Sequence, residues 1–145
     1  MGHDDDPTPE FLDNCAAEIS ELFSYWNSLR NSRQMPARRD MDPLDIPRLL
    51  RDIQLIDVSL TPLEFHYRLI GTRRVDSIGE ELTGKKVGDV GSILDDYRDV
   101  VEQNTYKYTQ TKSSNPTKGD MMEETIFLPF SDNGECVNII MVCII

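Results

Sequence analysis

Residues 53–87 read IQLIDVSLTPLEFHYRLIGTRRVDSIGEELTGKKV, and this stretch decides the fold. Two runs rich in β-branched and aromatic residues, 53–58 and 65–70, flank a break at Thr61-Pro62. Short runs of this composition on either side of a proline-containing break are typical of a β-hairpin. The stretch therefore predicts two antiparallel strands that open a small sheet.

The end of the second run predicts how the chain leaves this hairpin. Gly71 follows the run directly, and we expect a positive φ there because glycine adopts such angles at little cost. A short helix over residues 73–78 and a glycine turn at Thr83-Gly84 are expected next. These features place helices on one side of the sheet.

Alternation within the second run predicts which side chains share a face. Tyr67 and Leu69 fall on one face and His66 and Arg68 on the other, and we expect the first pair to face a long helix. An arginine on such a strand either pairs with an acid, for which Asp57 is available, or binds an anionic ligand.

Two longer helices are expected outside this stretch. Residues 10–30 carry apolar side chains at heptad spacing, which suits packing on the chain's own core and also pairing of two copies. We assign four members of this stripe to a homodimer interface: Leu12, Ile19, Leu22 and Trp26. Residues 93–112 are expected to form the second long helix, and a short helix is expected over residues 45–51.

The chain closes with a predicted hairpin of residues 124–130 and 135–144. A two-residue loop at Asn133-Gly134 places Leu128 opposite Ile139 and Ile126 opposite Met141 on one wholly apolar face. The other face is also too apolar for open water, so we expect the N-terminal helix to cover it. Its apolar members are Phe127, Ile140 and Val142.

Composition limits the function. The chain has 145 residues, enough for one domain, and a net charge of −11, which makes a nucleic-acid partner improbable. No apolar run reaches the length of about 18 residues that a membrane span needs. Three scattered cysteines, Cys15, Cys136 and Cys143, suit buried free thiols in a cytoplasmic protein. Residues 1–9 are acidic and carry two prolines, which predicts a disordered lead-in.

Four motifs occur in a recognisable order: MPARRDMDP with IPRLL in residues 35–50, FHYRLIGT in 65–72, LTGK in 82–85 and LPFSDNG in 128–134. In these motifs the chain resembles a PAS domain, and more narrowly a bacterial family of small stand-alone PAS-like proteins. The resemblance covers residues 35–145, with residues 10–31 as a flanking helix. It implies an α+β fold: a curved antiparallel sheet of about five strands with helices on one face and an N-terminal flanking helix.

No catalytic or cofactor signature is present. The chain has two histidines, His3 and His66, and neither lies on the predicted long helix where a haem-binding PAS domain usually places its ligand. That helix also lacks the cysteine of a photoactive flavin site, and no hydrolase, phosphate-loop or zinc-protease motif occurs. We expect a protein that is not an enzyme and has no identifiable cofactor.

Two functions remain open. One is a sensor whose small-molecule ligand lies between the sheet and the long helix and shifts the docking of the flanking helix. The other is a ligand-free module that pairs with a second copy or a signalling partner. Tyr67 and Tyr97 either flank the pocket of such a sensor or are core aromatics. The candidate pocket comprises Tyr67, Leu69, Tyr97, Val101, Leu128 and Met141.

Overall fold

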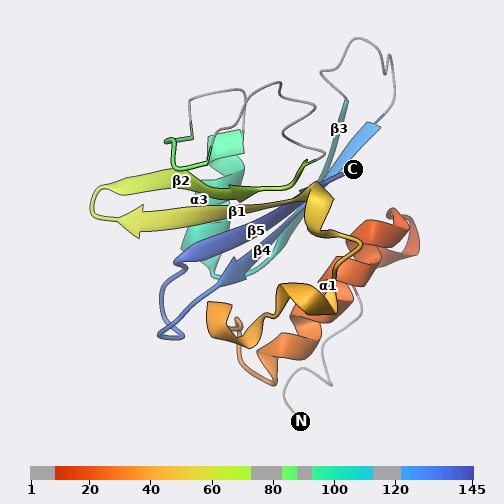
Figure 1. Ribbon diagram of the computed structural model, residues 1–145, viewed down its shortest axis with the longest axis horizontal. Helices are drawn as coiled ribbons and strands as arrows, with labels where there is room; N and C mark the ends of the chain where they lie inside the picture. The colour runs from red at the N-terminus through yellow and green to blue at the C-terminus, as the bar shows by residue number, and fades with distance from the viewer. Residues whose placement is uncertain (1–8, 73–82, 88–92, 113–121) are drawn as a thin grey trace.

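A five-stranded antiparallel sheet in the order β2-β1-β5-β4-β3 forms the centre of the molecule (Figure 1). The computed structural model describes residues 9–72, 83–87, 93–112 and 122–145. The strands are β1 (Ile53–Leu60), β2 (Leu63–Ile70), β3 (Lys107–Lys112), β4 (Met122–Phe130) and β5 (Ile139–Ile144). This sheet, with its helices, confirms the expected α+β class and PAS-like architecture.

The hairpin that opens the sheet forms as expected, with Thr61-Pro62 as its turn and a cis peptide bond between these two residues. Gly84 has the positive φ of a glycine turn, 86°. Gly71 differs from expectation because its φ is not in the left-handed region. A Cβ on Gly71 would lie 2.4 Å from the backbone oxygens of Leu50 and Arg51. Glycine is needed at position 71 for close backbone packing and not for its φ.

A β-bulge in β2 overturns the expected alternation. Leu55 pairs with Leu69, but the next residue, Ile56, pairs with Tyr67, so Arg68 is an extra residue in β2. An extra residue reverses the phase of a strand. Tyr67 therefore packs on one face of the sheet, whereas Leu69 lies at a groove on the other. Tyr67 and Leu69 do not share a face, contrary to the sequence prediction.

Arg68 itself pairs with Asp57 on the neighbouring strand. Its Nη1 lies 3.2 Å from Asp57 Oδ1, and both side chains are largely exposed. This contact confirms the structural role that was weighed against an anion site. An exposed pair of this kind contributes about 1 kcal/mol or less.

The N-terminal helix is shorter than the apolar pattern of residues 10–30 predicts. Residues Glu10–Asp13 form a 3-10 turn, and the α-helix α1 spans Ala17–Arg30. Glu124 on β4 determines this start, because its Oε1 accepts the backbone N–H of Ala16 at 2.9 Å and the hydroxyl of Tyr108 at 2.9 Å. A carboxylate at a helix N-terminus satisfies a free backbone donor and complements the helix dipole.

Residues 38–52 join α1 to β1 and are called the connector here. They contain three 3-10 turns, Arg38–Asp40, Pro43–Asp45 and Leu50–Asp52, and no α-helix, so the expected helix over residues 45–51 is not formed. Pro43 and Pro47 lack the backbone N–H that a continuous helix requires, which keeps this segment irregular.

The second long helix, α3, spans Ile93–Gln103 and ends well before residue 112. Asn104 has a φ of 54°, and from Lys107 the chain forms β3 at the edge of the sheet. The expected helix over residues 93–112 is therefore wrong in its last third. Alternating threonines in this last part, Thr109 and Thr111, favour a strand, and pairing with β4 decides the outcome.

The terminal hairpin forms with a longer loop and a register shifted by two residues. Phe130 pairs with Ile139 and Leu128 with Met141, instead of Leu128 with Ile139. A network around Asn133 holds the loop, since its side-chain oxygen accepts the backbone N–H groups of Glu135 and Cys136. A shift of two keeps each side chain on its face, so the predicted apolar face of Ile126, Leu128 and Met141 survives.

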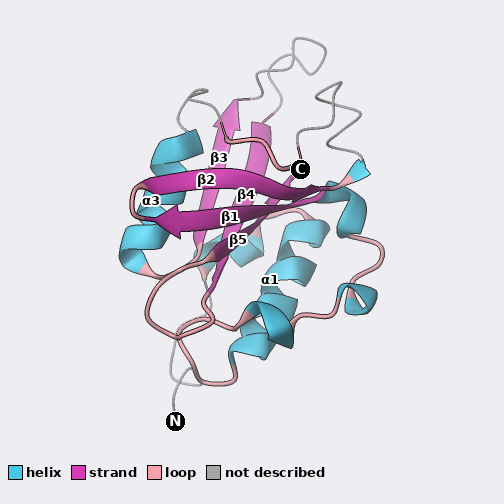
Figure 2. Ribbon diagram, turned by 60° about the vertical axis from the view of Figure 1, so that its left-hand side comes forward, coloured by secondary structure: helices cyan, strands magenta, loops and turns pink. Residues whose placement is uncertain are grey.

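Two hydrophobic clusters cover the two faces of the sheet. The helices α1 and α3 lie on different sides of the sheet (Figure 2). On the first face, called the α1 face, the side chains of α1 and the connector pack on Ile126, Leu128 and Met141. On the second, the α3 face, Tyr97 and Val100 pack on the other set of strand residues. That set includes Phe127, Ile140 and Val142. The expected assignment was the reverse, with α1 on Phe127, Ile140 and Val142.

Two expectations lie outside the described residues. The short helix over residues 73–78 is one, and all of the lead-in over residues 1–9 except Pro9 is the other.

Candidate functional site

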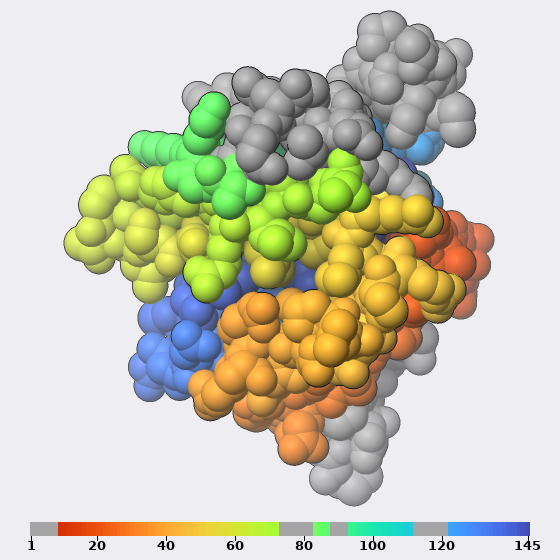
Figure 3. Space-filling view, in the orientation of Figure 1, coloured from red at the N-terminus to blue at the C-terminus, as the bar shows by residue number. Residues whose placement is uncertain are grey.

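A groove of about 420 Å³ lies on the α1 face, between the connector and strands β1, β2 and β5. In the space-filling view, β5 is visible at the bottom of a depression between the connector and the β1–β2 hairpin (Figure 3). This volume falls within the range of small-molecule sites, about 300–1,000 Å³. The groove is lined by Arg38, Met41, Pro43, Ile46, Pro47, Leu50, Arg51, Ile53, Leu55, Leu69, Ile70, Gly71, Thr72 and Met141.

The lining is aliphatic over most of its surface. Leucine, isoleucine, proline and methionine side chains make up the walls, and none of the lining residues within the described part of the chain is aromatic or acidic. Met41 and Met141 add flexible thioethers, which adapt to ligands of irregular shape. Such a lining suits a hydrocarbon body better than a flat aromatic ring, which usually stacks on an aromatic side chain.

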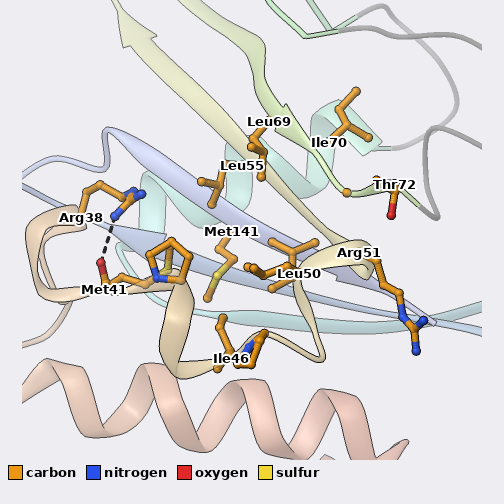
Figure 4. Close-up of a pocket in the computed structure, with 14 residues that line it drawn as sticks. Arg38, Met41, Ile46, Leu50, Arg51, Leu55, Leu69, Ile70, Thr72 and Met141 are labelled. Atoms are coloured by element: carbon orange, nitrogen blue, oxygen red, sulfur yellow. Dashed lines mark hydrogen bonds between the residues drawn. The ribbon is translucent and has the colours of Figure 1, made fainter.

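Arg38 lies at one end of this groove, beside Met41, and we call this end the inner end (Figure 4). Its Nη1 donates to the backbone oxygen of Met41 at 3.1 Å. Its Nε is buried and has no acceptor among the residues that the structure describes. A buried donor without a partner costs about 1–3 kcal/mol, more when it carries charge, so the position of Arg38 requires an explanation.

The turn that carries Arg38 is fixed by Asp40. Asp40 Oδ2 accepts the backbone N–H of Ala37 at 2.8 Å and a guanidinium N–H of Arg33 at 2.7 Å. These two hydrogen bonds lower the pKa of the Asp40 carboxyl below its usual value of 3.8. Asp40 therefore stays ionised at neutral pH and holds the backbone that points Arg38 at the groove.

Arg51 lies at the opposite end of the groove from Arg38 (Figure 4). Its side chain is exposed and points away from the apolar centre. The groove thus has a half-buried cation at one end and a solvated cation at the other. Both are arginines in a chain whose net charge is −11.

The six predicted pocket residues are divided between the two faces of the sheet. Tyr67, Tyr97 and Val101 belong to the cluster on the α3 face. Leu69 and Met141 line the groove on the α1 face, and Leu128 is buried in the core beside it. The structure brings together two of the six at a cavity, and it does not assemble the pocket that the sequence predicted.

The centre of the α3 face is filled by aromatic rings. The Tyr97 ring is 2% exposed, with its centroid 5.2 Å from that of Phe65 and 5.8 Å from that of Phe127. Tyr97 is thus a core aromatic. A depression of about 380 Å³ lies at the edge of this face, and both of its cations are paired: Lys86 with Glu64 and Arg98 with Asp95.

The residues predicted for a dimer interface lie within their own chain. Ile19, Leu22 and Trp26 are fully buried in the cluster on the α1 face, and Leu12 is partly buried against it. Trp26 also donates its indole N–H to the backbone oxygen of Pro129 at 2.9 Å. The apolar stripe of α1 is therefore used for intramolecular packing, the first of the two roles considered for it.

Sequence reasoning missed the connector as the wall of a site. The signal was present in Pro43 and Pro47, which prevent a helix from packing closely on the sheet and so leave space beneath. No feature of the sequence distinguished Arg38 as the arginine at the groove, because residues 25–50 contain four other arginines.

The remaining candidate chemistry is sparse. Among the described residues, no group of His, Cys, Asp and Glu is placed to hold a metal ion, and no helix is long and apolar enough to cross a membrane. The three cysteines are free, but Cys136 is exposed, contrary to the expected burial of all three. Cys15 is half-buried, and burial, followed by the Glu124 carboxylate, raises its thiol pKa.

A family model described as a PAS domain matches residues 16–143. No curated protein matches the chain. The family match includes α1, the connector with its groove, α3, strands β1 to β4 and all of β5 but its last residue, and PAS domains are typically non-catalytic. The chain therefore belongs to the PAS domain family, whose members are generally sensory or signalling modules.

Proposed function

We propose that this PAS domain is a sensor whose small-molecule ligand binds in the groove on the α1 face and alters the docking of the connector and α1. The groove is the observation that carries this proposal, because it is an apolar cavity of ligand size beside Arg38, whose buried Nε lacks an acceptor among the described residues.

The contacts between the connector and α1 support a route from ligand to signal. Tyr25 on α1 donates to Asp45 Oδ2 at 2.9 Å and accepts the backbone N–H of Asp42 at 3.0 Å. Glu21 on α1 pairs with Arg48 at 3.0 Å. A ligand that widens the groove moves the connector away from the sheet, and these contacts transmit the movement to α1.

Tyr25 is suited to this role at neutral pH. Burial, followed by its hydrogen bond to Asp45, raises the pKa of the Tyr25 hydroxyl. The hydroxyl therefore remains protonated and keeps donating to the connector. A phenolate next to Asp42 and Asp45 would repel both carboxylates.

Native mass spectrometry of the full chain purified from its own cells tests the proposal. We expect a mass retained by the wild type and lost from Leu69→Trp, since Leu69 lies at the groove and is 44% exposed, so a larger ring blocks the groove without disturbing the core. Leu44→Trp is the matched control, because Leu44 lies on the connector, is 80% exposed and does not line the groove. No retained mass in the wild type, or equal retention in Leu69→Trp, would count against the sensor.

A ligand-free pairing module is the second candidate. Leu44 and Leu69 expose apolar surface on the connector and at the groove, and a second copy or a signalling partner that covers both would remove them from water. Light scattering separates the candidates. A homodimer in the wild type that dissociates in Leu44→Asp, with no retained small molecule, favours the pairing module.

A further inference from the structure

We propose that the ligand of the groove is an aliphatic molecule with a single terminal carboxylate, held by the Arg38 guanidinium with its hydrocarbon chain directed toward β1, β2 and β5. This inference rests on the proposed function, because it names the chemical class of the ligand that the groove binds.

The hydrocarbon part of the ligand is inferred from the side chains that line the groove. The central lining residues in Figure 4 are Ile46, Leu50, Leu55 and Met141, which offer no ring for stacking and no side-chain hydrogen-bond donor of their own. A ligand rich in heteroatoms would leave its polar atoms unpaired against these side chains. An unbranched or lightly branched alkyl chain loses nothing by burial there and gains the hydrophobic contribution of each methylene.

The carboxylate of the ligand is inferred from the hydrogen-bond partners of Arg38 and from the residues around it. Four other arginines are already ion-paired: Arg33 pairs with Asp40, Arg48 with Glu21, Arg68 with Asp57 and Arg98 with Asp95. Arg38 has a backbone oxygen on Nη1, while its buried Nε has no acceptor among the described residues, and none of the described residues that line the groove is an acid. A planar carboxylate accepts N–H donors from one guanidinium in the bidentate manner, which supplies the missing partner.

The two ends of the groove are not equivalent. Arg51 is exposed and already solvated, so a carboxylate there gains little over water. Arg38 is half-buried and its Nε is fully buried, so an ion pair at that end is less screened. Among the described residues Arg38 is the single cation at the inner end, which also favours one carboxylate over a phosphate or a dicarboxylate, because these would bring charge without a second partner.

Binding of three eight-carbon probes that differ in the head group tests the inference on the wild-type full chain. Octanoate, octan-1-ol and octylammonium are titrated separately while backbone amide shifts are followed by NMR. We expect octanoate to bind at least about tenfold more tightly than octan-1-ol, the smallest change that loss of a charged hydrogen bond usually causes. Octylammonium should bind most weakly because Arg38 repels it.

Arg38→Met tests the assigned residue. It keeps an unbranched apolar stem and removes the charged guanidinium, so octanoate should lose its advantage over octan-1-ol while octan-1-ol binds as before. Arg39→Met is the matched control, since Arg39 is the exposed neighbour and does not line the groove. Arg51→Met tests the orientation of the ligand in the groove. If the carboxylate lies at Arg38, this variant should leave the preference for octanoate nearly intact.

The outcomes separate this inference from the proposed function. If octan-1-ol binds as well as octanoate and Leu69→Trp abolishes both, the groove binds ligands but the carboxylate inference is wrong. If the preference for octanoate survives Arg38→Met or is lost in Arg51→Met, the assignment to Arg38 is wrong. If no probe shifts the groove amides and no mass is retained from cells, the proposed function fails as well. The comparison of head groups in the wild type stands even if Arg38→Met does not fold.

Discussion

The two faces of the sheet are both too apolar for open water but are covered differently. On the α3 face, a helix lies on the sheet and Tyr97 occupies the centre between Phe65 and Phe127. On the α1 face, α1 covers β4, while β1 and the end of β2 are covered by the proline-containing 3-10 turns of the connector. The first covering is close-packed at its centre and the second leaves a groove.

The difference teaches how a cavity arises in a small domain. A helix presents a continuous stripe of side chains that interdigitates with a sheet, so little space remains. Short turns present side chains at irregular intervals and leave gaps that no side chain of their own fills. The function of this domain is therefore to be sought on the face with the irregular cover.

Removal of residues 1–31 is expected to have the largest effect, because it uncovers the α1 face completely. Ile19, Leu22, Phe23 and Trp26 are all buried there, and each contributes about 1.5–3 kcal/mol. Their combined loss is comparable with the whole stability of a domain, about 5–15 kcal/mol. We expect aggregation or loss of the cooperative thermal transition in calorimetry.

Removal of residues 1–8 alone is the control and should leave the transition unchanged, because the sequence predicts disorder there. A soluble fragment of residues 32–145 that folds cooperatively would show that α1 is an appendage. The α1 face would then need its covering helix less than the α3 face does.

The neighbouring residues Leu55 and Ile56 allow a direct comparison of the faces. Leu55 lines the groove, and Ile56 is fully buried on the α3 face. Truncation in a packed site adds a cavity to the loss of burial, whereas a site beside an existing groove gains less new cavity. We expect about 4 kcal/mol for Ile56→Ala and about 2 kcal/mol for Leu55→Ala in urea unfolding. Equal losses would mean that the groove closes in solution.

Gly71 tests the contact between the end of β2 and the connector. A methyl group at position 71 would collide with the backbone oxygens of Leu50 and Arg51, so we expect Gly71→Ala to cost about 3 kcal/mol. Gly84→Ala is the control, because Gly84 has a positive φ and open space around it, and should cost about 1 kcal/mol. Thermal denaturation of both variants that showed the reverse order would contradict the close approach.

Asp40→Asn is expected to have the smallest effect and a characteristic pH dependence. The folded-state pKa of Asp40 is lowered, so its contribution is present above the usual value of 3.8 and is lost as the pH falls through the folded pKa. The wild type should exceed the variant by roughly 1 kcal/mol or less at pH 7, since the Arg33 partner is largely exposed. The difference should shrink in unfolding curves as the pH falls below 3.8 and through the lowered folded pKa. A difference that is constant with pH would show that ionised Asp40 does not hold the turn.

Much of the fold followed from local pattern. The β1–β2 hairpin, the α1 stripe, the start of α3 and the apolar face of Ile126 and Leu128 were all visible as periodicity in the chain. The Arg68–Asp57 pair was also predictable, because the turn fixes the register of the hairpin. The end of α3 was not, since residues 107–112 satisfy both helical and strand patterns until β4 pairs with them.

The sequence by itself determined that the strands have two apolar faces that both need a cover, because alternation is a local property of the chain. Only the tertiary structure decided which helix covers which face, since neither face is polar enough to exclude either helix. It also decided the site: the extra residue Arg68 turns Leu69 away from Tyr67, and packing of the connector on Gly71 leaves the groove beside Arg38. Both depend on contacts between residues distant in the chain, which no local pattern encodes.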